Sequence, residues 1–148
     1  MSEDYYNRTK GYSFLSTVLK EGVVIGWNSV LISKAERKFN VGKLVYDSGY
    51  YAESIDHFYY SMYCVAKALL LKKGFTPRTH SGTIYLIQVH YVETGELDSN
   101  IHFSFSNAQT LREQVDYDST DDISRHVARE KRNVCDEFIK KAKNILDL

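Results

Sequence analysis

The sequence has little proline, cysteine and tryptophan for its 148 residues. Its one proline, Pro77, and the lack of a low-complexity linker, an internal repeat or a long block of like charge predict one compact unit. The two cysteines, Cys64 and Cys135, match neither a zinc-site spacing nor a secreted disulfide framework. We therefore expect a protein of a reducing, cytoplasmic compartment.

An excess of charge of either sign is also missing. Nineteen basic and nineteen acidic residues give a net charge of zero, so nucleic acid would have to bind through a local patch. The most apolar early stretch, FLSTVLKEGVVIGW, is interrupted by Lys20 and Glu21, and the chain does not begin like a signal peptide. We expect a soluble protein that does not associate with a membrane.

Helical spacing of apolar residues dominates from Asn28 onward. The clearest helix is predicted over residues 50–73, where Gly74 and Pro77 follow its end, and the last over residues 120–146. Thr79 or Ser81 is the expected cap of a further helix that closes at Gly95, and Ser119 or Thr120 the expected cap of the last helix. Nothing in the sequence favours a sheet, so an all-α, up-and-down bundle of four or five helices is predicted.

Residues 1–28 are harder to interpret. Their two apolar runs flank Gly22, which is compatible with a helix that ends there or with a short hairpin, and we favour the helix. The expected organisation is a helical N-terminal extension over residues 1–28, packed on a helical domain of residues 29–148.

A polar stripe lies beside the apolar face of the predicted 50–73 helix. At 100° per residue the stripe contains Asp56, Tyr60, Tyr63 and Lys67. Twelve tyrosines in the chain indicate many half-buried rings whose hydroxyls need polar neighbours. The stripe is compatible with the margin of the core, a subunit interface or a ligand groove.

The last predicted helix carries a row of basic residues. Within about a quarter turn it gathers five cations over about 27 Å, namely Arg125, Arg129, Arg132, Lys140 and Lys143. Such a basic patch suits a phosphate backbone or an acidic partner, although an ordinary solvated face is the simpler interpretation.

Arg112 stands in an acidic setting, LREQVDYDST. Its simplest role is an ion pair with Asp116, one turn further on, or with Asp56 of the 50–73 helix. We favour an organising role in which Arg112 bridges Asp56, Asp116 and Tyr117 at the margin of a dimer. His80, after a turn and before Ser81, is expected to hydrogen bond locally or to contact a ligand in the groove.

Several motifs occur in an order that resembles the HEPN superfamily of small prokaryotic helical proteins. They are a Gly-Tyr-x-x-Ala opening, an aromatic helix that ends in Ala-Leu-Leu, a Thr-His pair and a later Arg-x-x-x-Asp-Tyr; here they are Gly49, Tyr50 or Tyr51, Ala52, Ala68 to Leu70, Thr79, His80, Arg112, Asp116 and Tyr117. The likeness covers about residues 29–146.

The resemblance implies a helical homodimer that is often partnered with a minimal nucleotidyltransferase. Catalytic members are metal-independent ribonucleases, often toxins of toxin–antitoxin pairs, and use an arginine followed after four to six residues by a histidine. At that spacing Arg112 is followed by Tyr117, Asp118 and Ser119, and none of the other arginines has a histidine there. No catalytic residue is therefore assigned; Arg112 and Tyr117 are the candidates if RNA is cleaved.

No metal or cofactor is expected. Residues 116–122 alternate like the start of an EF-hand loop, but Asp121 stands at the glycine position and Val127 at the glutamate position. No phosphate-binding glycine loop or zinc-protease motif is present in the sequence. The favoured function is a homodimeric binding or regulatory protein that acts with a nucleotidyltransferase or binds a nucleotide; the alternative is a ribonuclease toxin.

Overall fold

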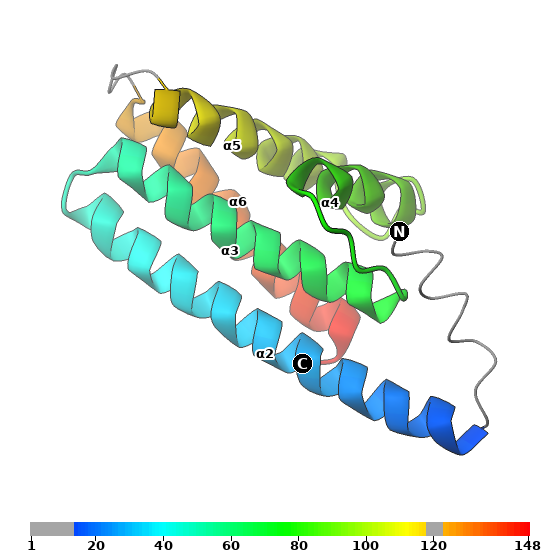
Figure 1. Ribbon diagram of the computed structural model, residues 1–148. Coiled ribbons are helices and arrows are strands. Elements are labelled where there is room, and N and C mark those ends of the chain that lie inside the picture. The colour runs from blue at the N-terminus through cyan, green and yellow to red at the C-terminus, as the bar shows by residue number, and fades with distance from the viewer. Residues whose placement is uncertain (1–13, 118–122) are drawn as a thin grey trace.

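The computed structural model describes residues 14–117 and 123–148, and over these ranges the chain is helical with no strand. The elements are α2 (Phe14–Asp47), α3 (Tyr51–Lys72), α4 (His80–Ile87), a π-helical turn η1 (Gln88–Val92), α5 (Ser99–Tyr117) and α6 (Arg125–Leu146). α2 and α3 lie side by side and antiparallel, α6 packs on another side of α3, and α4 and α5 run along a third (Figure 1). The predicted all-α bundle is confirmed.

α3 is the central helix of the bundle and packs against α2, α4, α5 and α6. It is therefore buried around most of its circumference, including Phe58, Tyr59, Met62 and Leu69, which have no exposed surface. One of its two buried serines, Ser61, donates a hydrogen bond of 2.6 Å to the carbonyl of Ala35 in α2. A buried hydroxyl must have such a partner, and this one ties the backbone of α2 to α3.

The ends of the helices follow local chemistry. Thr79, one of the two predicted caps, caps α4: its side chain accepts a hydrogen bond from the Gly82 amide. α6 begins later than predicted, because Ser124 is its cap and accepts from the Val127 amide at 3.3 Å. Ser119 and Thr120, the expected caps, lie outside the described residues. The helix expected to close at Gly95 instead ends as α4 followed by η1.

α2 passes through Gly22 and Gly26 without a break, so Gly22 does not end a helix. Its N-terminal part projects beyond the other helices (Figure 1), and a Cβ added at either glycine would have no neighbour within 4 Å. The exposed apolar side chains Val23, Trp27 and Val30 lie on this part. Among the described helices, none is long and apolar enough to cross a membrane.

Gly42, in contrast, lies where α2 crosses α3. A Cβ there would lie 2.7 Å from the buried ring of Phe58 and 3.1 Å from the Cβ of His57. We predict that Gly42→Ala lowers the free energy of unfolding by about 1–3 kcal/mol through overpacking, measured by urea denaturation.

The matched control is Gly26→Ala in the same helix, where the added methyl group meets open space. Its gain in helix propensity is about 1 kcal/mol at most, so it should leave stability unchanged or raise it. Equal destabilisation by both substitutions would contradict the close packing of α2 on α3.

Candidate functional site

Three helices bring polar and aromatic side chains together on one side of α3. Residues spaced three and four apart on α3 present Asp56, Tyr60 and Tyr63 along one face, beside the start of α4 and the second half of α5. Together they form a set that we call the Arg112 cluster, consisting of Asp56, Tyr59, Tyr60, Tyr63, His80 and Arg112.

Among the described residues, Arg112 contacts a carboxylate and two aromatic rings of α3. Its Nε donates to Oδ1 of Asp56 at 2.9 Å, the pairing that the sequence suggested across two helices. The guanidinium lies 4.8 Å from the ring centroid of Tyr60 and 5.6 Å from that of Tyr59. With 21% of its side chain exposed, the cation keeps access to solvent while the rings and the carboxylate fix its position.

His80 lies at the first position of α4 and is packed against three tyrosines. Its Nδ1 is 2.5 Å from the hydroxyl of Tyr59. Its ring stacks on Tyr63 at 4.3 Å between centroids and meets the edge of Tyr60 at 5.9 Å. The Thr79 cap positions this turn. The hydrogen bond of His80 reaches Tyr59 of α3 and is therefore not the local bond at the end of its own helix that the sequence suggested.

The protonation state of the pair follows from burial. Burial lowers the pKa of His80 below its ordinary value, and the nearby positive charge of Arg112 lowers it further. Burial also raises the pKa of Tyr59, which therefore stays protonated at neutral pH. The hydrogen bond between the Tyr59 hydroxyl and Nδ1 of a neutral His80 can run either way: the hydroxyl donates when Nε2 carries the ring proton, and it accepts when Nδ1 carries it.

The structure places some of the remaining predicted groove residues and leaves others untested. The ammonium of Lys67 lies 5.5 Å from the ring centroid of Tyr63, at the border of the cluster. The side chains of Asp116 and Tyr117 lie outside the described part of the chain, so the proposed bridge from Arg112 to them stays a prediction. Tyr59 lies among apolar residues in the sequence, and no spacing signalled its contact with His80.

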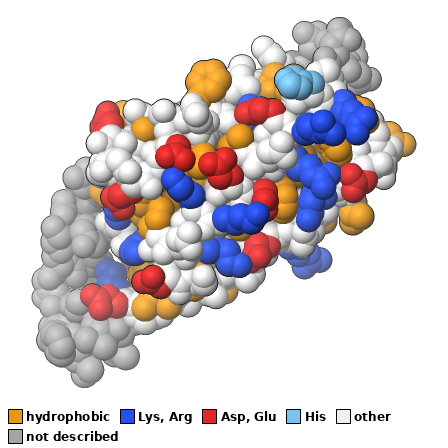
Figure 2. Space-filling model, turned by 180° about the vertical axis from the view of Figure 1, so that it is seen from behind, with side chains coloured by type: hydrophobic (Ala, Val, Ile, Leu, Met, Phe, Trp, Pro, Cys, Tyr) orange, Lys and Arg blue, Asp and Glu red, His pale blue; other side chains and the backbone are white. Residues whose placement is uncertain are grey.

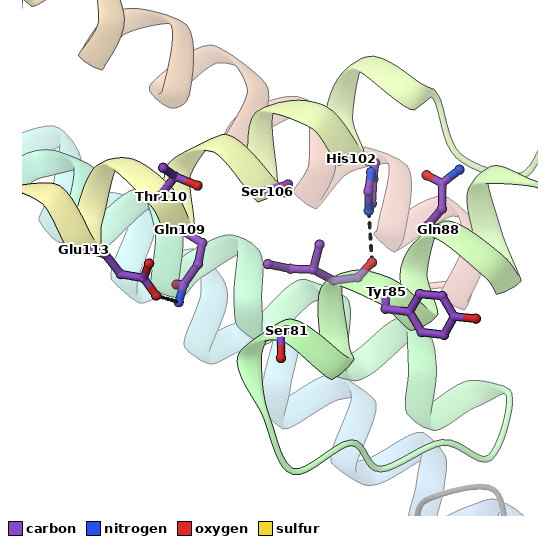
Figure 3. Close-up of a pocket in the computed structure, with 9 residues that line it drawn as sticks. Ser81, Tyr85, Gln88, His102, Ser106, Gln109, Thr110 and Glu113 are labelled. Carbon is purple, nitrogen blue, oxygen red and sulfur yellow. Dashed lines mark hydrogen bonds between the residues drawn. The ribbon is translucent and has the colours of Figure 1, made fainter.

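A groove between α4 and α5 adjoins the cluster (Figure 3). It has a volume of about 450 Å³ and is lined by Ser81, Ile84, Tyr85, Gln88, His102, Ser106, Gln109, Thr110 and Glu113. Gln109 connects it to the cluster, because its amide donates to Glu113 at 2.8 Å while its oxygen accepts from Arg112 at 3.5 Å. Apart from the helical spacing of Gln109 and Arg112, no feature of the sequence indicated this groove.

The basic row of the last helix is largely paired. Lys140 contacts Asp136 at 2.9 Å on the same helix, whereas Arg132 contacts Asp47 at 3.0 Å and Lys143 contacts Glu36 at 3.4 Å, both on α2. Figure 2 shows basic and acidic side chains interspersed on the side of the molecule where α6 lies. Arg125 and Arg129, near the start of α6, are exposed.

Metal-binding residue types do not converge in the part of the chain that is described: no three His, Cys, Asp or Glu side chains there form a group. Cys64 and Cys135 are buried free thiols. Burial raises the pKa of Cys135 to about 12, so neither its position nor its protonation suits a nucleophile. Arginine, histidine and tyrosine thus carry the chemistry of the site.

The fold and the cluster define a small helical-bundle protein with a half-buried arginine–histidine–tyrosine site on its surface. The family model of the HEPN domain matches residues 29–148, and the chain belongs to this family. It is 33% identical to a Methanocaldococcus jannaschii protein named "Putative toxin", over 78% of this chain and 79% of that protein.

Other relatives match a similar part of the chain. A UPF0332 protein of Archaeoglobus fulgidus is 35% identical over 78% of this chain and 92% of its own length. A second M. jannaschii protein with the same toxin name is 27% identical over 78% of this chain and 89% of its own length.

The environment of His80 gives a testable pH dependence. We predict an NMR titration midpoint for His80 below the ordinary value of 6.5, because folding disfavours its charged form. Below pH 6.5 the unfolded chain binds a proton that native His80 does not, so this residue makes stability fall as the pH falls through that value.

The control for the pH dependence is His80→Gln, which removes the titrating group. The variant should lose part of the slope of unfolding free energy against pH between neutral and mildly acidic conditions. A wild-type midpoint at or above 6.5, or an unchanged slope in His80→Gln, would contradict the inferred neutral state.

Proposed function

We propose that this HEPN-family chain is a homodimeric binding protein that holds a nucleotide, or a nucleotide unit of RNA, at the Arg112 cluster. The observation that carries the proposal is that Arg112 and His80, from two different helices, converge on the same side chain, Tyr59. The role of this binding is regulatory: a protein partner responds to whether the ligand is bound.

The chemistry of the cluster suits such a ligand. A guanidinium is the usual side-chain partner of a phosphate, and it remains charged at any physiological pH. Tyr60, Tyr63 and His80 offer ring faces and edges on which a base stacks, and the groove between α4 and α5 begins beside them. Nε2 of His80 adds a hydrogen-bonding group.

Two features favour binding over cleavage. Arg112 is drawn toward Asp56, whose negative charge lies next to the position of a bound phosphate. The chain also lacks the arginine–histidine spacing associated with the ribonucleases of the family.

A metal-independent ribonuclease toxin is the second candidate. The proximity of Arg112 and His80 favours it, because the two residue types of the family motif then meet from separate helices. The toxin name of two relatives also favours it. In this case Nε2 of His80 would have to be unprotonated so that it could accept a proton, with the Tyr59 hydroxyl accepting the hydrogen bond from Nδ1.

The proposed homodimer is supported by the projecting part of α2. Val23, Trp27 and Val30 are 59%, 57% and 54% exposed and lie on one side of that helix. Exposed apolar side chains that recur along one helix are typical of a surface that packs against another helix. The resemblance to HEPN proteins supports a nucleotidyltransferase as the protein partner.

Nucleotide binding is tested with adenosine monophosphate and a short single-stranded RNA by isothermal titration calorimetry. Arg112→Ala and His80→Ala should each weaken binding by about ten-fold or more, because each removes a hydrogen bond or charge contact to the ligand. Lys140→Ala, on the exposed side of α6, is the control and should bind like the wild type. Equal affinity in all four proteins would contradict the proposal.

Incubation with total RNA separates the two candidate functions. We predict that the wild type, Arg112→Ala and His80→Ala leave the RNA equally intact. Cleavage by the wild type that both substitutions abolish would overturn the binding role in favour of the ribonuclease.

The homodimer is tested through Trp27, the single tryptophan of the chain. Its fluorescence maximum should move to shorter wavelength as protein concentration rises, in parallel with a doubling of mass in light scattering. Val30→Asp should prevent both changes, while Phe103→Asp, at a side chain 72% exposed on α5, should not. A wild type that stays monomeric at high concentration would contradict the proposal.

A further inference from the structure

Two lysines extend the Arg112 cluster along the partly exposed side of α3. The ammonium of Lys38, on α2, lies 5.6 Å from the ring centroid of Tyr60, and that of Lys67, on α3, lies 5.5 Å from the centroid of Tyr63. The two tyrosine rings are neighbours, with centroids 6.4 Å apart and planes at 88° to each other. All four side chains belong to partly buried residues, so the rings and the ammonium groups keep contact with solvent.

The packing of α2 on α3 brings Lys38 to this place. The hydrogen bond from Ser61 to the carbonyl of Ala35 fixes how the two antiparallel helices lie along one another. Lys38 comes three residues after Ala35, nearly one helical turn, on the flank of α2 that borders Tyr60. The start of α4 borders the same rings from the other side. The two lysines and the two rings therefore lie between α2 and α4, which flank α3 in Figure 1.

Neither lysine has an acidic partner in the part of the chain that is described. No carboxylate there lies within ion-pair distance of the ammonium of Lys38 or Lys67. The acids of the site have other partners: Asp56 pairs with Arg112, and Glu113 accepts a hydrogen bond from an amide side chain of its own helix. The two ammonium groups are therefore available to neutralise the charge of a ligand.

Two cations share the ring of Tyr60. Arg112 reaches it from α5, with the guanidinium 4.8 Å from the ring centroid, and Lys38 reaches it from α2. The separation of the two charges cannot exceed the sum of their distances to this centroid, so one small ligand can contact both. Like charges held so close repel one another, and a ligand with several negative charges offsets that repulsion. A single phosphate on Arg112 would leave the charge of Lys38 unneutralised.

We propose that Lys38 and Lys67 form a second phosphate subsite beside the Arg112 cluster, so that the ligand of the cluster carries two or more phosphate groups. The inference rests on the proposed nucleotide binding and defines its ligand more closely. One phosphate contacts Arg112, the next contacts Lys38 across the ring of Tyr60, and Lys67 on the neighbouring ring adds positive charge to the second position. A nucleoside diphosphate and a short RNA both supply such a pair of phosphates.

Three adenine ligands test the second subsite by isothermal titration calorimetry with the full chain, in a buffer without divalent cations. AMP carries one phosphate group, whereas ADP and the 5′-phosphorylated dinucleotide pApA each carry two. We expect ADP, pApA or both to bind about ten-fold tighter than AMP, because the second phosphate gains a charge-assisted hydrogen bond. A gain with ADP alone assigns the subsite to a nucleoside diphosphate, and a gain with pApA alone assigns it to an RNA backbone.

Substitutions locate the origin of the gain. Lys38→Gln should remove most of it and Lys67→Gln part of it, while both variants bind AMP like the wild type. Lys43→Gln is the matched control and should keep the whole gain. Lys43 is a partly buried lysine of the same helix whose ammonium also lies over a ring, 4.8 Å from the centroid of Phe39, but outside the cluster.

The subsite is overturned if neither ADP nor pApA binds more tightly than AMP, or if Lys38→Gln retains the whole gain. Failure of the proposed nucleotide site gives a different result: Arg112→Ala would then bind all three ligands like the wild type. A gain that Lys38→Gln removes would support the second subsite even in that case, whereas no binding of any of the three ligands would overturn both proposals.

Discussion

The burial of Tyr59 is the constraint on which the candidate site depends. Its side chain has no exposed surface because α3 lies in the middle of the bundle. A buried hydroxyl needs a partner, and His80 at the start of α4 supplies it. The same ring stacks with Phe105 and faces the guanidinium of Arg112, both from α5. One side chain of the core thereby fixes the relative positions of the two groups that can contact a ligand.

The helical spacing of the sequence was enough to predict much of this arrangement. It identified α3 and the stripe that contains Asp56, Tyr60 and Tyr63, and it named Asp56 as one of two alternative ion-pair partners of Arg112. It missed the role of Tyr59, because a helical projection separates buried from exposed positions but does not say which helix covers a buried one. A tyrosine among apolar residues looks like core packing until the partner of its hydroxyl is known.

Predictions from the sequence were also incomplete for α2 and α6, the first and last described helices. Gly22 suggested the end of a helix, yet a glycine costs a helix interior only about 1 kcal/mol, and α2 continues through it. The basic row on α6 was compatible with a surface for phosphate or an acidic partner, and more simply with an ordinary solvated face. A projection of one helix cannot include acids from another, and Asp47 and Glu36 of α2 pair with two of its cations. What remains is a localised positive charge at the start of α6, in a chain whose net charge is zero.

The central claim is that Arg112 and His80 act as one binding unit because both are held on Tyr59. A double-mutant cycle in the free energy of nucleotide binding, built from Arg112→Ala, His80→Ala and the double variant, tests it most directly. If the two residues hold one ligand together, the double variant should lose less than the sum of the single losses, with a coupling of about 0.5 kcal/mol or more. Strictly additive losses would mean that the two side chains act separately and would contradict the account.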